Sequence, residues 1–90
     1  MLTVWKYKVS NDDCFEIELP INSKLLSVQV QFHEVYLWCL VNPKEKAIQK
    51  RKFRLAGTGH LINENNLEFI GTFQLLNGGL VFHLFEILIK

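Results

Sequence analysis

Four consecutive residues, Gly57-Thr58-Gly59-His60, combine backbone freedom with nearby polar side chains, which is what an anion site needs. Glycine lets backbone N–H groups approach a ligand closely and form a concavity that attracts anions. Arg51 and Arg54 stand just upstream, and an arginine can hold a phosphate through two parallel hydrogen bonds. The sequence therefore predicts that an anionic ligand is bound by Arg51, Arg54, Gly57, Thr58, Gly59 and His60.

The same four residues also fit a plain turn. No helix pattern follows them and the other glycines of a dinucleotide fingerprint are missing, so they form neither a Rossmann motif nor a P-loop. The glycines could instead form a bulge at the end of a strand, with His60 bonded to its own backbone. Ligand contact and structural turn both stay open from the sequence.

Trp5 and Trp38 are the aromatic candidates for ligand contact, because such rings stack on bases in nucleotide pockets and single-strand readers. Packing in the core is the alternative for each ring. Trp38 and Tyr36 share one parity of an apolar run, and if the other parity faces the core, these two rings point to the opposite face. We therefore add Trp5 and Trp38 to the predicted ligand-binding residues.

Nothing in the chain is typical of a catalytic or metal site. No nucleophile sits in a recognisable elbow, and Glu16 and Glu18 alternate with apolar residues on an expected solvent face. The three histidines and two cysteines lack the close spacing of zinc ligands, and Cys39 within its apolar run is typical of a buried thiol. The sequence predicts a protein that is not an enzyme and needs no metal and no cofactor.

Positive charge is concentrated in residues 44–54. This segment has six basic residues and one acidic residue, a net charge of +5, whereas the other 79 residues carry −4 because the whole chain carries +1. A basic block could attract phosphates or an acidic protein face, although a solvated loop would look the same. The sequence pI of about 7.8 falls short of the ~9 typical of nucleic-acid-binding domains, so direct binding to DNA or RNA is not predicted.

Apolar and polar residues alternate with a period of two, which indicates strands with one buried face. Residues 5–9 and 15–19 alternate strictly, and the turn residues 10–13 between them predict a hairpin. Residues 26–32, 50–55 and 69–76 continue the strand pattern, and Asn77-Gly78-Gly79 is a strong hairpin signal.

Two further runs, residues 35–41 and 80–89, are apolar on both faces and so belong in the middle of a sheet or at a subunit contact. With 90 residues, 49% of them hydrophobic and 21% charged, the chain predicts a single domain over residues 1–90. We expect a mainly β fold, a single small antiparallel sheet or sandwich of about six or seven strands built from hairpins, with little helix.

Size and composition also predict location and assembly. No run approaches the ~18 apolar residues of a membrane helix and the amino terminus lacks the order of a signal peptide, so we expect a cytoplasmic protein without membrane contact. The apolar surface of the two double-faced strands exceeds what so small a domain can cover. The sequence therefore predicts a homo-oligomer.

Several collinear blocks along nearly the whole chain resemble a family of small phage and prophage proteins labelled only as a domain of unknown function. The start at Asn42-Pro43-Lys44 and the basic insert after it depart from the more mixed or acidic segment of that family. The blocks are Trp5-Lys6-Tyr7, residues 17–20, residues 26–31, Leu37-Trp38, Phe53-Arg54, residues 57–60, residues 69–72, residues 80–83 and Phe85-Glu86.

By analogy, the resemblance implies a phage counter-defence protein of the anti-CBASS or anti-Thoeris type, acting in the cytoplasm of an infected bacterium. Such a protein would be an oligomer that sequesters a cyclic nucleotide or a related anionic immune signal. The alternative is a protein–protein inhibitor of a host defence protein or nuclease, acting through the basic segment or a sheet edge. Fold-level analogy alone does not decide between them.

Overall fold

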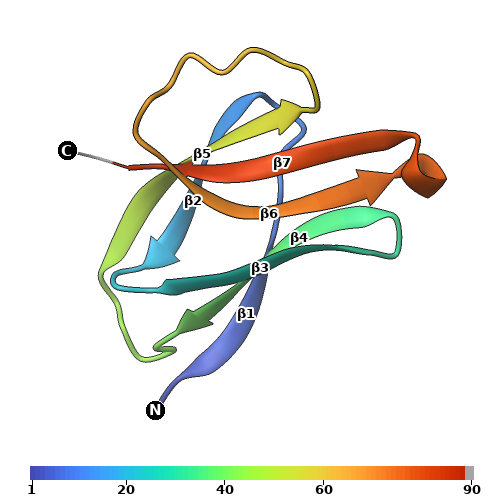
Figure 1. Cartoon of the computed structure of the whole chain (residues 1–90). Helices are drawn as coiled ribbons and strands as arrows, with labels where there is room; N and C mark the ends of the chain where they lie inside the picture. Colours follow the sequence, from blue (N-terminus) through green and yellow to red (C-terminus); the bar gives the residue numbers. More distant parts are fainter. Residues whose placement is uncertain (89–90) are drawn as a thin grey trace.

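Seven antiparallel strands form almost all the regular structure in residues 1–88, the residues that the computed structural model describes (Figure 1). A three-residue 3-10 turn, η1 (Leu76–Gly78), is the one helical element among them, and none of these residues forms a helix suited to crossing a membrane. The mainly β prediction is confirmed. The strands are β1 (Thr3–Lys8), β2 (Cys14–Pro20), β3 (Lys24–Gln31), β4 (Glu34–Val41), β5 (Ile48–Gly57), β6 (Leu67–Leu75) and β7 (Leu80–Ile87).

The strands form two sheets that enclose one core. The first has the order β1-β4-β3 and the second the order β2-β5-β7-β6. The two runs that are apolar on both faces became β4 and β7, and both are interior strands, as predicted; Ile89 lies outside the described residues. Inward side chains of both sheets form the core, in which the largest fully buried members are Phe53, Leu19, Leu37, Leu84, Val41 and Cys39.

The predicted hairpin between residues 5–9 and 15–19 was wrong. The first run pairs with β4, where Trp5 lies opposite Cys39, and the second pairs with β5, where Glu16 lies opposite Lys52. The connection after Val9 passes from one sheet to the other. Period-two alternation indicates which face of a strand is buried but not which strand lies beside it, so two neighbouring runs looked like partners.

The edges of β3 and β6 lie side by side without ladder hydrogen bonds, and we call this junction the seam (Figure 1). At its centre Val28 packs on Gly71 so closely that a Cβ on that glycine would come within 2.7 Å of Val28 Cγ1. A register shift in each strand leaves one extra residue, Leu26 in β3 and Ile70 in β6. Bulges bend a strand, so we infer that these two splay the edges apart on one side of the close contact.

Both tight turns use residues in the left-handed region. Phe32 and His33 have φ of 52° and 67° between β3 and β4, and Asn77 and Gly78 have φ of 54° and 91° between β6 and β7. The second turn confirms the hairpin signal of Asn77-Gly78-Gly79. The Phe32-His33 connection is a two-residue primed turn, which requires such φ values because its twist matches that of the strands. The β6–β7 connection is a four-residue loop, since Leu75 pairs with Leu80, and Leu76 also has a positive φ of 52°.

Replacing Gly71 by alanine should lower the free energy of unfolding by about 1–3 kcal/mol, because the added methyl group overpacks the seam. Urea denaturation followed by tryptophan fluorescence measures the loss. Val28→Ala makes room for that methyl group, so the double variant should lose less than the sum of the two single variants. Strictly additive losses would show that the close contact in the seam does not limit packing there.

Candidate functional site

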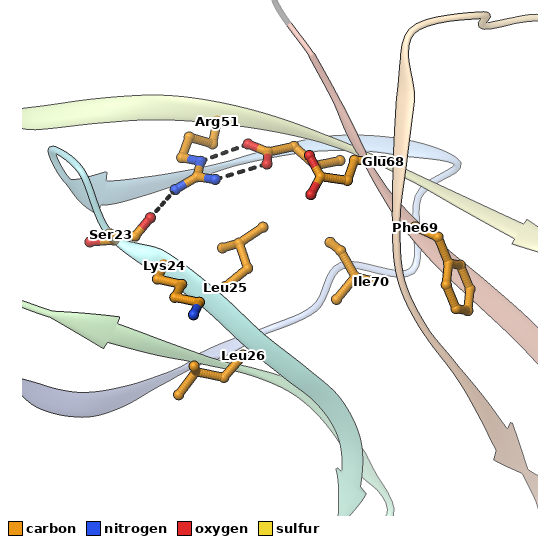
Figure 2. A pocket seen from close by; sticks show the side chains of 9 residues that line it. Ser23, Lys24, Leu25, Leu26, Arg51, Glu68, Phe69 and Ile70 are labelled. Atoms are coloured by element: carbon orange, nitrogen blue, oxygen red, sulfur yellow. Dashed lines mark hydrogen bonds and ion pairs between the residues drawn. The ribbon is translucent and has the colours of Figure 1, made fainter.

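A cleft of about 380 Å³ opens at the seam, next to the two bulges (Figure 2). Leu25 of β3 and Ile70 of β6 point into it, and the exposed side chains of Leu26 and Phe69 flank it. A neighbouring hollow of about 490 Å³ shares four of its polar residues, Ser23, Arg51, Glu68 and Glu86. We call this place the seam cleft; it is lined by Ser23, Lys24, Leu25, Leu26, Arg51, Glu68, Phe69, Ile70 and Glu86.

Arg51 and Glu86 form a two-pronged ion pair on the wall of the seam cleft (Figure 2). Arg51 Nε donates to Glu86 Oε2 at 2.6 Å and Nη2 donates to Oε1 at 2.8 Å, while Nη1 donates to the carbonyl of Ser23 at 2.5 Å. The side chains are only 17% and 11% exposed. The hydrogen bonds to Glu86 raise the pKa of Arg51 above its usual value, so the guanidinium stays charged and its charge is compensated.

Glu68 adds a second carboxylate to the seam cleft. It lies directly opposite Glu86 in the pairing of β6 with β7, a position where like charges repel. Among the described residues no hydrogen bond or ion pair involves its carboxylate or the ammonium group of Lys24. With Arg51 and Glu86 paired and one free group of each sign, the charged side chains of the seam cleft sum to zero.

Arg54 points to the opposite face of the sheet from Arg51, as the alternation of residues 50–55 predicts. It is 9% exposed and lies under the segment between β5 and β6. Its Nη1 donates to the carbonyl of Leu55 at 2.8 Å, its Nη2 donates to the carbonyl of Leu61 at 3.0 Å, and its Nε donates to Glu64 Oε1 at 3.2 Å. A hydrogen bond from its own backbone and the charge of Arg54 lower the pKa of Glu64. Arg54 thus anchors this segment to the sheet.

Residues 57–60 form a turn that is closed by its own hydrogen bonds and tied to β7, where the N–H of Thr58 donates to the carbonyl of Val81 at 3.2 Å. The N–H of Gly57 donates to His60 Nδ1 at 3.2 Å, and the N–H of His60 donates to the carbonyl of Gly57 at 3.0 Å. The imidazole covers Gly57 so closely that a Cβ there would lie 2.8 Å from His60 Cε1, and Gly59 adopts a φ of 90°. Each of these contacts stabilises the turn. A structural role in the turn therefore accounts for both glycines.

A chain of hydroxyl and imidazole groups on the outer face of the second sheet was missed from the sequence. Thr58 Oγ1 lies 2.8 Å from His83 Nε2, and Thr72 Oγ1 lies 2.9 Å from His83 Nδ1. The three residues come from the end of β5, from β7 and from β6, and strand pairing alone brings them together. No sequence spacing signals such a contact.

Trp5 and Trp38 lie on different faces of the first sheet. Trp5 is opposite the buried Cys39 and is 42% exposed where β1 forms the edge. Trp38 faces outward with Tyr36, and the two rings meet edge to face at 5.8 Å between centroids, as predicted. The predicted ligand-binding residues therefore do not converge: Arg51 alone among them lines the seam cleft.

The cations on β5 have carboxylate neighbours on adjacent elements. Lys50 and Lys52 lie opposite Glu18 and Glu16 of β2, Arg51 pairs with Glu86, and Arg54 pairs with Glu64. Ion pairs thus compensate Arg51 and Arg54 of the +5 segment. Lys50 and Lys52 face glutamates across the strand pair without a salt bridge among the described residues, and Lys44 and Lys46 are exposed before β5. The alternating charges of residues 15–19 carried this signal, but using it required knowing that β2 and β5 are neighbours.

The residues described by the structure include no cluster of three His, Cys, Asp or Glu side chains that could hold a metal ion. Of the two thiols, Cys14 is exposed and Cys39 is buried in the core. Burial raises the pKa of Cys39 to about 11, so it behaves as an apolar core side chain.

Comparison with known proteins assigns the chain to a family. A family described as a domain of unknown function, DUF7352, matches residues 1–88. The chain belongs to the DUF7352 family. No curated protein and no solved structure matches this DUF7352 chain. The match confirms the resemblance to a domain of unknown function, and the DUF7352 description names no ligand, partner or source.

Arg51→Met in this DUF7352 chain should cost about 3 kcal/mol of unfolding free energy, because it leaves the Glu86 carboxylate largely buried without a partner. Adding Glu86→Leu removes that stranded charge and should recover most of the loss. Urea denaturation of both variants measures the difference. A double variant as unstable as the single one would show that the ion pair itself stabilises the seam.

The two thiols should react very differently with a maleimide at neutral pH. Cys14 is exposed and should be labelled in the folded protein, whereas Cys39 is buried with its pKa near 11 and should react only after unfolding. Mass spectrometry before and after adding urea counts the modified thiols. Labelling of Cys39 in the folded state would mean that the core opens between the sheets.

Proposed function

We propose that this DUF7352 protein is a non-catalytic binding protein that takes up an extended, positively charged segment of a partner protein in its seam cleft. One observation carries the proposal: the two buried cations of β5, Arg51 and Arg54, are paired with carboxylates within the chain. Among the described residues Glu68 and Lys24 make no ion pair, and both lie beside two unpaired strand edges. The charges of the cleft sum to zero, so it has no excess of positive charge that would hold an anion, and its free carboxylate can pair with a cationic group of a ligand.

A peptide in extended conformation can supply partners for the unpaired backbone groups and side chains of the seam cleft. Its backbone can pair with the free groups of an edge strand, which gives affinity without a preformed pocket for every side chain. A lysine or arginine of the peptide can pair with Glu68 and relieve its repulsion with Glu86. Leu25 and Ile70 supply apolar contacts for a neighbouring side chain. This is the sheet-edge form of the protein–protein alternative.

Sequestration of an anionic nucleotide by a phage counter-defence protein stays a prediction. For a phosphate, Arg51 would have to leave Glu86 or share its remaining N–H groups, and Glu68 would repel the incoming charge. Arg54 faces the other side of the sheet and cannot help within one chain. Within one chain, Lys24 is the one cation of the cleft without a carboxylate partner among the described residues, so tight binding of a nucleotide would need further cations from a second copy at the same place.

An array of immobilised extended nonapeptides with systematically varied charge tests the proposal. The labelled protein should bind best to peptides that carry lysine or arginine beside apolar residues. Glu68→Lys should weaken that binding at least tenfold, because it replaces attraction by repulsion in the cleft. Asp12→Lys is the matched control: it makes the same charge change at an exposed loop residue outside the cleft and should leave binding unchanged.

Calorimetry with 3′,5′-cyclic mononucleotides and cyclic dinucleotides tests the competing function, nucleotide sequestration. The proposal expects no heat of binding from any of them. Binding that depends on Arg51, with intact nucleotide recovered after denaturation, would overturn the peptide-binding proposal in favour of sequestration. Recovery of hydrolysed nucleotide would overturn the non-catalytic assignment as well.

A further inference from the structure

We propose that copies of this chain assemble by antiparallel pairing of β1 of one copy with β2 of another. These two strands are the edges left free on the side of the sheets away from the seam, since β1 ends the first sheet and β2 ends the second. The inference concerns a different surface from the seam cleft and does not depend on what the cleft binds.

The ladder bonds identify which backbone groups of each edge are free. The N–H of Val9 donates to Val35, so the odd residues of β1 bond to β4 and the even ones turn their backbone groups outward. In the same way Leu55 donates to the carbonyl of Asp13, so the odd residues of β2 bond to β5. The outward groups belong to Val4, Lys6 and Lys8 on β1, and to Cys14, Glu16, Glu18 and Pro20 on β2. Pro20 has no N–H to donate, so the free donors of β2 lie between Cys14 and Glu18.

The side chains at these positions are electrostatically complementary. Within the chain Lys6 donates to Gln31 Oε1 at 2.7 Å and Lys8 pairs with Glu34 at 3.2 Å, and pairing with a second copy requires these exposed side chains to share or exchange those contacts. In antiparallel pairing, one register places Lys6 opposite Glu18 of the second copy and Lys8 opposite Glu16 of the second copy, with all four on the outer face. Opposite charges at directly opposed positions stabilise a strand pair. The same register sets the inward Tyr7 against Ile17 of the second copy, so apolar and charged faces match along both strands.

Other pairings of these edges lack that match. Pairing β2 with a second β2 at full overlap sets Glu16 or Glu18 against a glutamate, and like charges disfavour it. Pairing β1 with a second β1 about Trp5 sets the lysines against Val4 and Leu2, which creates no charge pair. The β1–β2 combination alone pairs every charge of one edge with an opposite charge of the other.

This pairing is the hairpin that the sequence predicts and that the single chain does not form. Within the chain β1 and β2 belong to different sheets, and each keeps an unpaired edge. Val4 and Trp5 at the β1 edge are 48% and 42% exposed, so a second copy would also cover apolar surface there. Unpaired apolar edges promote association between chains. A contact between two different edges can be reciprocal in a dimer or repeat around a ring.

Light scattering after size-exclusion chromatography at micromolar concentrations tests the pairing through charge reversal. The wild type should be an oligomer, whereas Lys6→Glu/Lys8→Glu and Glu16→Lys/Glu18→Lys should each run near the 10.5 kDa of one chain. Mixing these two variants restores opposite charges at the contact and should restore assembly. Lys44→Glu/Lys46→Glu makes the same charge change in the loop before β5 and should stay assembled.

Cross-linking of the wild type covers the case in which a charge-reversed variant does not fold. A mixture of ¹⁵N-labelled and unlabelled protein is treated with a carbodiimide, which joins lysine to a neighbouring carboxylate. Lys6 and Lys8 should link to Glu18 and Glu16 in mixed-isotope products. The Lys8–Glu34 pair at 3.2 Å is the internal control and should link within one copy. A monomeric wild type, or an oligomer without these mixed links, overturns the proposal.

Discussion

Strand β5 brings two arginines, Arg51 and Arg54, into largely buried positions, and each of them needs a carboxylate close by. The strand lies between β2 and β7, and its alternation sends Arg51 toward the core while Lys50, Lys52 and Arg54 face outward. A largely buried guanidinium without a partner would lower the free energy of unfolding by several times what an exposed ion pair contributes to it. The positions of Glu86 on β7 and of Glu64 on the segment after β5 follow from that requirement.

This requirement also determines what is left for binding. Because Arg51 is satisfied by Glu86 and Ser23, the charges of the seam cleft cancel. Among the described residues the cleft presents one unpaired carboxylate, Glu68, one unpaired ammonium group, Lys24, two bulged edges and apolar walls. At the far edge, Glu16 and Glu18 complement Lys50 and Lys52 within the sheet while their backbone groups remain free. The ion pairs thus explain why Arg51 and Arg54 of the basic segment are structural, and the unpaired backbone groups explain why contact with other chains is expected at sheet edges.

The sequence predicted much of the fold because alternation reports directly on burial. It placed Phe53 and Arg51 on one face of a strand and Arg54 on the other, and it identified the interior strands β4 and β7 from their double-sided apolar character. It did not predict that β1 and β2 belong to different sheets, because which strands pair depends on contacts between residues far apart in the chain. The hairpin signal at Asn77-Gly78-Gly79 was reliable because a local φ requirement determines it.

The candidate site was less predictable for the same reason. Arg51 was identified, but Glu86 and Glu68 lie more than fifteen residues further along and join it only through the order β5-β7-β6. Bulges at Leu26 and Ile70, which open the cleft, have no signature in the local pattern. Residues 57–60 illustrate the converse: a motif that suggested an anion site is explained by a turn that His60 closes on Gly57.

The central claim is that Arg51 and Arg54 are structural cations whose hydrogen bonds are made within the chain. Side-chain ¹⁵N NMR of the arginines, recorded with and without millimolar inorganic pyrophosphate, tests it most directly. Slowly exchanging Nε–H signals for both residues, unchanged by pyrophosphate, are the predicted result. Rapid solvent exchange at Arg51 together with a shift on adding pyrophosphate would contradict the account and return this guanidinium to the role of a phosphate ligand.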